Sequence, residues 1–83
     1  MNANLDQKAQ KLLEELKNGT ETKRRAAAYR LGKAGNPFAI PGLTEALQDE
    51  DAIVRQNAAN ALREIENLQK NPLVKKRERI VAA

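Results

Sequence analysis

The chain has no cysteine, no histidine and no tryptophan. Without cysteine and histidine it cannot form a disulfide, a Cys/His zinc site, a cysteine nucleophile or a Ser-His-Asp triad. The side chains that remain for catalysis are carboxylates, lysines, one tyrosine and a few hydroxyls. Their spacing matches neither a calcium-binding loop nor a phosphate-binding loop. We therefore expect a protein that is not an enzyme and that uses no metal and no cofactor.

Aromatic residues and long apolar runs are also scarce. Tyr29 and Phe38 are the only aromatic side chains, whereas single-strand binders and sequence-specific RNA readers stack bases on several. No apolar run approaches the roughly 20 residues that span a bilayer, so membrane insertion is not expected. Residues 1–8 lack the basic-then-apolar order of a signal peptide. These features predict a cytoplasmic protein for which nucleic acid is a less favoured partner.

What the sequence does contain is typical of helices. Its 83 residues fit one small domain with a thin core. Alanine and leucine dominate the apolar residues, and 31% of all residues are charged, with both signs present. This composition predicts an all-α protein with much helical surface.

Apolar residues recur at helical spacing in five segments. The first three predicted helices cover residues 4–18, 20–35 and 36–48. The fourth starts at residue 51 and ends between Asn67 and Asn71, and a last short helix starts at Pro72. Asn4, Thr20 or Thr22, Asn36 and Asp51 are the expected N-caps. Gly19 and Gly35 are expected to end the first two helices, Gly19 in the left-handed conformation. Pro41 predicts a third helix that is either kinked early or regular only from that residue.

An internal repeat is the strongest pattern in the chain. Shifting the sequence by 31 positions aligns residues of matching type over about 25 residues of each copy, in one register. The aligned pairs are Leu12 with Leu43, Leu16 with Leu47, Arg24 with Arg55, Ala27 with Ala58, Ala28 with Ala59, Leu31 with Leu62, Ala34 with Ile65, and Asn36 with Asn67. Each copy is a helix pair that cannot bury its apolar stripes alone, so stacking of the two pairs is expected to form one core.

These residues resemble the short HEAT-like repeat of the phycobilisome-lyase type. The resemblance rests on residues 24–37 (RRAAAYRLGKAGNP), 39–47 (AIPGLTEAL) and 49–51 (DED), and on residues 54–65 (VRQNAANALREI) of the second copy. Asn36 stands where that pattern usually has Asp, and the Pro-x-Ala-Ile-Pro element does not recur after Asn67. The resemblance implies a short right-handed α-solenoid of antiparallel helix pairs, with about five helices here.

The resemblance also implies where a partner binds, because the second helices of such solenoids line the concave face. Carried over to this chain, the solvent side of those helices consists of Arg25, Tyr29, Lys33, Gln56, Asn60 and Glu64. The two copies differ at these positions, as expected where specificity is set on a fixed scaffold. Tyr29 is the favoured anchor, since exposed tyrosine is enriched at interfaces, although it can equally lean on its neighbours.

Arg24 and Arg55 occupy equivalent positions, each after a polar turn. Glu21 and Thr22 precede Arg24, and Asp49 and Asp51 precede Arg55. The resemblance implies a structural role in which each arginine pairs with turn groups of its own or the adjacent repeat, and binding of anions along the row is the alternative.

The charge of the chain is concentrated at its C-terminal end. Residues 1–69 hold ten basic and ten acidic residues, so the formal charge of +4 lies within residues 70–83. The basic residues near the end are Lys75, Lys76, Arg77 and Arg79. We therefore divide the chain into a repeat domain, residues 1–69, and a basic amphipathic segment, residues 70–83, which either caps the last repeat or contacts an anionic partner.

Three functions follow from these patterns. The favoured one is a non-catalytic adaptor or scaffold that binds another protein on the second helices. The alternatives are an accessory subunit or chaperone of a bilin lyase, implied by the resemblance, and nucleic-acid binding through the basic segment. Since about three repeats are usually needed for stability, self-association through an open solenoid end is also expected.

Overall fold

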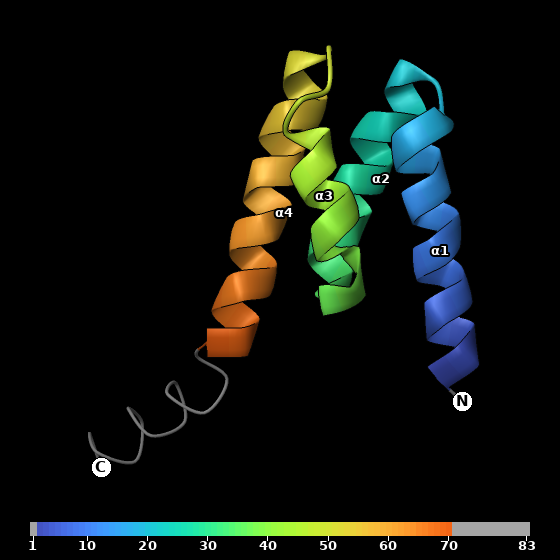
Figure 1. The fold of residues 1–83 in the computed structure, drawn as a ribbon, viewed down its shortest axis with the longest axis vertical. Coiled ribbons are helices and arrows are strands. Elements are labelled where there is room, and N and C mark those ends of the chain that lie inside the picture. The colour runs from blue at the N-terminus through green and yellow to red at the C-terminus, as the bar shows by residue number, and fades with distance from the viewer. Residues whose placement is uncertain (1, 71–83) are drawn as a thin grey trace.

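The computed structural model describes residues 2–70, with side chains described for residues 7–69. It contains α1 (Asn2–Asn18), α2 (Glu21–Ala34), a 3-10 turn η1 (Pro37–Ala39), α3 (Ile40–Ala46) and α4 (Ala52–Lys70). The helices run alternately up and down, with α3 between α1 and α4 in the view of Figure 1. The predicted all-α, HEAT-like solenoid is therefore confirmed, and the fifth helix predicted from Pro72 lies outside the described residues.

The helix starts agree with most of the predicted caps. The hydroxyl of Thr20, rather than that of Thr22, accepts a hydrogen bond from the Lys23 amide at 3.2 Å. Asn36 accepts from the Phe38 amide at 3.0 Å, and Asp51 accepts from the Val54 amide at 3.0 Å. A short polar side chain at each start thus satisfies a backbone N–H that has no partner within its helix.

Two predictions about the ends of α1 are wrong. Asn4 lies inside α1, which begins at Asn2. Gly19 does not adopt the left-handed conformation, since Gly35 (φ 68°) is the only residue with positive φ in the described part. The Gly19 amide instead continues the helical pattern to the Glu15 carbonyl at 2.8 Å. Glycine suits this turn by its small size, because a Cβ would lie 2.5 Å from that carbonyl oxygen.

The start of the second repeat resolves the question posed by Pro41. Asn36 and Pro37 open the 3-10 turn, and regular α-helix begins at Ile40. Pro41 therefore sits in the first turn of α3, where its missing N–H leaves no hydrogen bond unmade. The final helix, α4, continues to Lys70, which lies within the end predicted between Asn67 and Asn71.

All four helices contribute side chains to one apolar core. The most extensive contact joins α2 to α4, followed by α1 with α2 and α3 with α4, whereas α1 touches α3 less. The core side chains are Leu16, Ala27, Ala28, Leu31, Ala39, Leu43, Ala46, Val54, Ala58, Ala61 and Ile65. Gly32 lets the second helices approach closely, since a Cβ there would lie 2.7 Å from both Cα and Cβ of Ala61. The two repeats are thus one stacked unit, as the 31-residue register predicts.

Within residues 2–70 there is no helix both long and apolar enough to cross a membrane.

Candidate functional site

The exposed side chains of α2 and α4 form a shallow polar trough across both repeats. We call it the second-helix face, and it is lined by Tyr29, Lys33, Asn57, Asn60, Ala61, Arg63, Glu64 and Asn67 around a cavity of about 280 Å³. The Tyr29 side chain is prominent there, because the residue is 57% exposed.

Lys33 links the two helices on this face. Its Nζ lies 3.1 Å from Oε2 of Glu64 and 5.3 Å from the centroid of the Tyr29 ring. The hydrogen bond that Lys33 donates to Glu64, together with the negative charge of that carboxylate, raises the pKa of Lys33 above the ordinary lysine value. The Lys33 ammonium therefore contacts both Tyr29 of α2 and Glu64 of α4, across the boundary between the repeats. The face presents an aromatic ring beside an ion pair.

The other predicted partner-binding residues differ in how free their side chains are. Gln56 and Asn60 are exposed, and Asn60 Oδ1 accepts a hydrogen bond from Arg63 Nη1 at 3.2 Å. Arg25 is instead engaged within the chain, where its Nε and Nη2 each donate to Asp51 at 2.9 Å. It also lies 3.4 Å from Glu21. Arg25 thus contributes to the edge of the face as one half of an ion pair.

The turn between α3 and α4 gathers the residues that the sequence assigned structural roles. Arg24 donates to both carboxylate oxygens of Asp49, at 2.9 and 3.1 Å, and to the Gly19 carbonyl at 3.0 Å. Arg55 Nη1 donates to the Asp49 carbonyl at 2.6 Å. Arg24 therefore fixes the turn that follows α1 to the turn that precedes α4. The sequence indicated pairing with turn groups but did not single out Asp49.

Both aspartates of this turn have a lowered pKa. Burial alone would raise the pKa of Asp49, but the Arg24 hydrogen bonds and the Asp51 amide together hold it below the ordinary value. The Arg25 hydrogen bonds lower the pKa of Asp51, against the effect of burial, and the Val54 amide adds to this. The folded chain therefore stabilises both carboxylates in their ionised form.

These shifts predict destabilisation by acid. An aspartate in the unfolded chain has a pKa of about 3.9. Because both pKa values are lower in the folded chain, the two ionised carboxylates stabilise the fold, and this contribution is fully present above about pH 5. That stability is lost as the pH falls below about 4 through the folded pKa values, because the unfolded chain then binds more protons. Urea unfolding at pH 7 and pH 3 measures the difference. The variant with Asp49→Asn and Asp51→Asn keeps oxygen acceptors without charge, and its stability should change less; an equal change would contradict the assignment.

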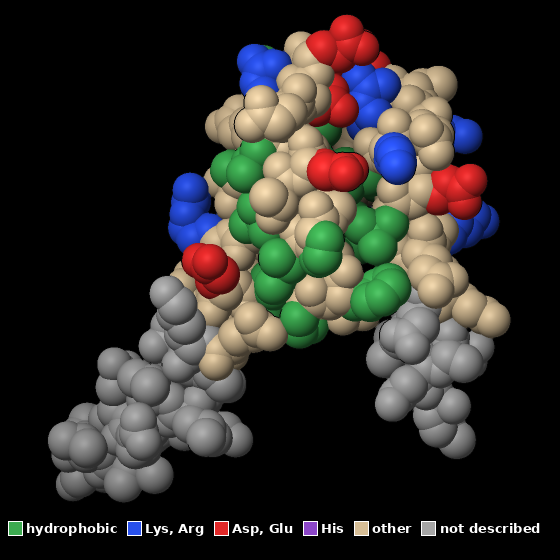
Figure 2. All heavy atoms as spheres, viewed as in Figure 1, with side chains coloured by type: hydrophobic (Ala, Val, Ile, Leu, Met, Phe, Trp, Pro, Cys, Tyr) green, Lys and Arg blue, Asp and Glu red, His purple; other side chains and the backbone are tan. Residues whose placement is uncertain are grey.

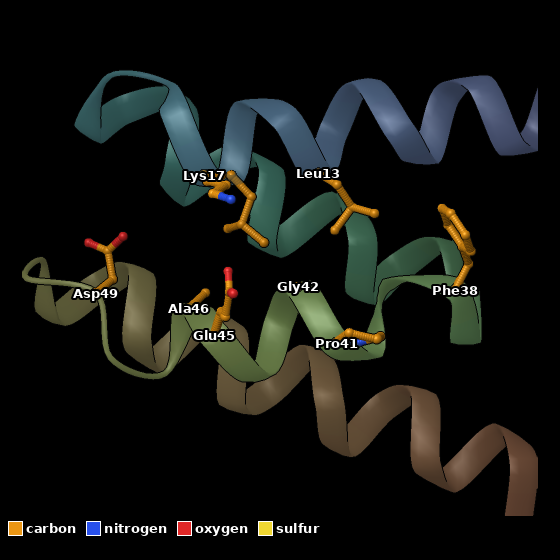
Figure 3. A pocket seen from close by; sticks show the side chains of 9 residues that line it. Leu13, Lys17, Phe38, Pro41, Gly42, Glu45, Ala46 and Asp49 are labelled. Carbon is orange, nitrogen blue, oxygen red and sulfur yellow. The ribbon is translucent and has the colours of Figure 1, made fainter.

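A second surface, not anticipated from the sequence, lies between α1 and α3. This α1/α3 groove has a cavity of about 460 Å³ lined by Leu13, Leu16, Lys17, Phe38, Pro41, Gly42, Glu45, Ala46 and Asp49. Phe38 stands at one end and Asp49 at the other, and Leu13 reaches from α1 toward α3 (Figure 3). Phe38 is 50% exposed. Its position just after the Asn36-Pro37 cap is the one signal that could have marked it.

The groove belongs to a wider apolar region. On the side of the molecule seen in Figure 2, hydrophobic side chains gather around α3, and charged side chains lie mostly toward the rim. Between residues 2 and 70 no group of three or more histidine, cysteine, aspartate or glutamate side chains is placed to hold a metal ion.

The stacked helix pairs agree with a comparison of the chain to known families. The family model of HEAT repeats matches residues 9–77. This chain belongs to the HEAT-repeat family. HEAT repeats generally mediate protein–protein interactions and are typically non-enzymatic scaffolds. No curated protein matches the chain.

Proposed function

We propose that this HEAT-repeat chain is a non-catalytic adaptor that binds another protein on its second-helix face. The observation that carries the proposal is Tyr29, a 57% exposed aromatic residue beside a trough that both repeats line. Tyrosine supplies a large, rigid contact area at a small entropic cost, and it is among the residues that dominate binding energy at interfaces.

The polar groups of the face suit a polypeptide partner. Asn60 and Asn67 line the trough with carboxamides, which can donate to and accept from a peptide backbone. Arg25 and Lys33 are already paired with Asp51 and Glu64, so the face carries less uncompensated positive charge than its sequence suggests. This balance favours a protein over a nucleic acid, whose binding depends on phosphate neutralisation.

The test compares the two exposed aromatic residues. Peptides are selected from a random displayed library against the full chain, and the Kd of the tightest one is measured by fluorescence anisotropy. Tyr29→Ala is expected to weaken binding by about 10–30-fold or more, as for a typical interface anchor. Phe38→Ala, a matched aromatic truncation in the α1/α3 groove, should leave Kd within about twofold. Loss with Phe38→Ala alone would place the site in the α1/α3 groove and contradict the proposal.

The finer assignments from the sequence stay predictions. The phycobilisome-lyase resemblance implies an accessory subunit or chaperone of a bilin lyase, for which phycobilin absorbance should change only when this chain joins the lyase and apoprotein. The nucleic-acid alternative places Lys75, Lys76, Arg77 and Arg79, which lie outside the described residues, on phosphates. DNA affinity that falls steeply with added salt would support that alternative. A cytoplasmic location remains part of our proposal.

A further inference from the structure

The two repeats share a sequence register but do not share the same environment at equivalent positions. Some side chains are buried in one repeat while the side chain at the equivalent position of the other repeat is exposed. The buried one must then be covered by the neighbouring repeat. Comparing positions 31 residues apart therefore shows which surfaces each repeat turns outward at the ends of the array.

The outward side of the first repeat is charged. Four buried core residues of the second repeat, Ala39, Ala46, Val54 and Ala61, correspond to Lys8, Glu15, Lys23 and Arg30. Lys8, Lys23 and Arg30 are exposed, and Glu15 is half-buried. This N-terminal face carries charges where a stacked helix pair would need small or apolar residues, and burying them would cost desolvation without matched partners.

The outward side of the second repeat is different, because it stays apolar. Leu16, Ala28 and Leu31 are buried in the first repeat, and their equivalents Leu47, Ala59 and Leu62 remain aliphatic but only half-buried. We call these three residues, together with the neighbouring Arg63, the C-terminal face. Leu47 and Leu62 pack with their inner sides on the core, so their outer sides are what the described residues leave uncovered.

Arg63 excludes another repeat stacked in the same way. It is the equivalent of Gly32, whose lack of a side chain permits the contact with Ala61 at the internal boundary. An exposed arginine at that point keeps a neighbouring helix at a greater distance, so neither an identical repeat nor a second copy can reproduce the internal stacking on this face. The occupant must instead pack on the aliphatic side chains beside Arg63.

We propose that residues 71–83 of the same chain cover the C-terminal face. These residues follow α4 directly, and they include four aliphatic side chains, Leu73, Val74, Ile80 and Val81. Thirteen residues span about 20 Å as a helix, enough to run back along α4 past Ala59. The HEAT-repeat match also continues beyond Lys70 to residue 77, as expected if this segment belongs to the repeat packing rather than to a free tail.

Under this proposal, the aliphatic residues of 71–83 contact the C-terminal face, and the lysines and arginines of the segment form its solvated side. Self-association through an open end is not needed, because one end of the array is charged and the other is covered from within the chain. Arg63 also lines the second-helix face, but the cover proposed here rests on Leu47, Ala59 and Leu62 and not on partner binding.

Cysteine pairs test it in the full chain, which has no native cysteine to interfere. Ala59→Cys is combined with Val74→Cys or Ile80→Cys, oxidised at low protein concentration and analysed by non-reducing electrophoresis and mass spectrometry. Intramolecular disulfides are expected for at least one pair. The matched control combines Arg30→Cys, on the N-terminal face, with the same partner and should not cross-link.

A second measurement does not depend on disulfide geometry. The single variant Ala59→Cys is labelled with a thiol reagent in the full chain and in a full chain where Leu73, Val74, Ile80 and Val81 are serine. We expect labelling to be at least about fivefold slower with the native segment, with no such difference for Arg30→Cys. Equal labelling rates, cross-links between two chains, or cross-links of 74 or 80 to Pro41→Cys in the α1/α3 groove instead of to position 59 would each overturn the proposal.

Discussion

Replacing Gly32 with alanine should lower the free energy of unfolding by about 1–3 kcal/mol, the usual cost of overpacking, or by more. The added Cβ would lie 2.7 Å from the Cα of Ala61, and a backbone atom cannot move aside without separating α2 from α4. Because the α2–α4 contact is the most extensive in the fold, the strain falls on the boundary between repeats. Urea unfolding followed by circular dichroism at 222 nm measures the loss.

Gly42 provides the matched control for this prediction. A Cβ at Gly42 would meet the Cδ2 atom of Leu13, which is the far end of a flexible side chain beside the open α1/α3 groove. Leu13 can rotate away, while alanine is better than glycine inside a helix by up to about 1 kcal/mol. Gly42→Ala should therefore be neutral or slightly stabilising. A loss for Gly42→Ala as large as that for Gly32→Ala would show that close helix contact at Gly32 is not the cause.

The second large effect is expected at Leu43, where truncation to alanine should cost about 2–5 kcal/mol. Leu43 is completely buried, so the substitution removes apolar contacts and leaves a cavity in the core. A small domain often has only about 3–5 kcal/mol of stability from its core. Leu43→Ala should therefore populate the unfolded chain measurably even without denaturant.

The repeat supplies the control for Leu43 as well. Leu12 is its equivalent in the first repeat, has the same chemistry, and is only half-buried. Leu12→Ala should cost less than half as much as Leu43→Ala, because water already reaches part of its side chain. Equal losses would mean that the two repeats bury their leucines equally, contrary to the asymmetry between the array's ends. Both variants should be compared by urea midpoint with an unchanged slope.

Local features of the fold could be predicted from the sequence because they depend on neighbouring residues. The 31-residue register identified the stacked pairs, and Thr20, Asn36 and Asp51 act as the predicted caps. Gly35 ends α2 as predicted, and it does so in the left-handed conformation. The left-handed conformation predicted for Gly19 is wrong, since a glycine that ends a helix for lack of space has the same sequence signature as one that needs positive φ.

Features that depend on how the helices pack against one another could not be predicted from the sequence. Arg24 could pair with any nearby acid, and only the packing of the turns brings Asp49, 25 positions away, to its guanidinium. Arg25 was expected on the solvent side of α2, and its guanidinium instead donates two hydrogen bonds to Asp51. The α1/α3 groove was also missed. It exists because α1 and α3, the first helices of the two repeats, contact each other less than α2 and α4 do, and helix packing of this kind cannot be read from the sequence. The predicted binding role of the second-helix face stays a prediction.

That role is tested most directly by titrating the isotopically labelled full chain with the library-selected peptide and following the backbone amide resonances. The account predicts that the largest shifts fall on α2 and α4 around Tyr29, Lys33, Asn60 and Glu64, and that the Tyr29→Ala variant loses them at the same peptide concentration. Amides around Phe38 and Glu45 should change little. Shifts confined to the α1/α3 groove, or to neither surface, would contradict the central claim that the second-helix face binds the partner.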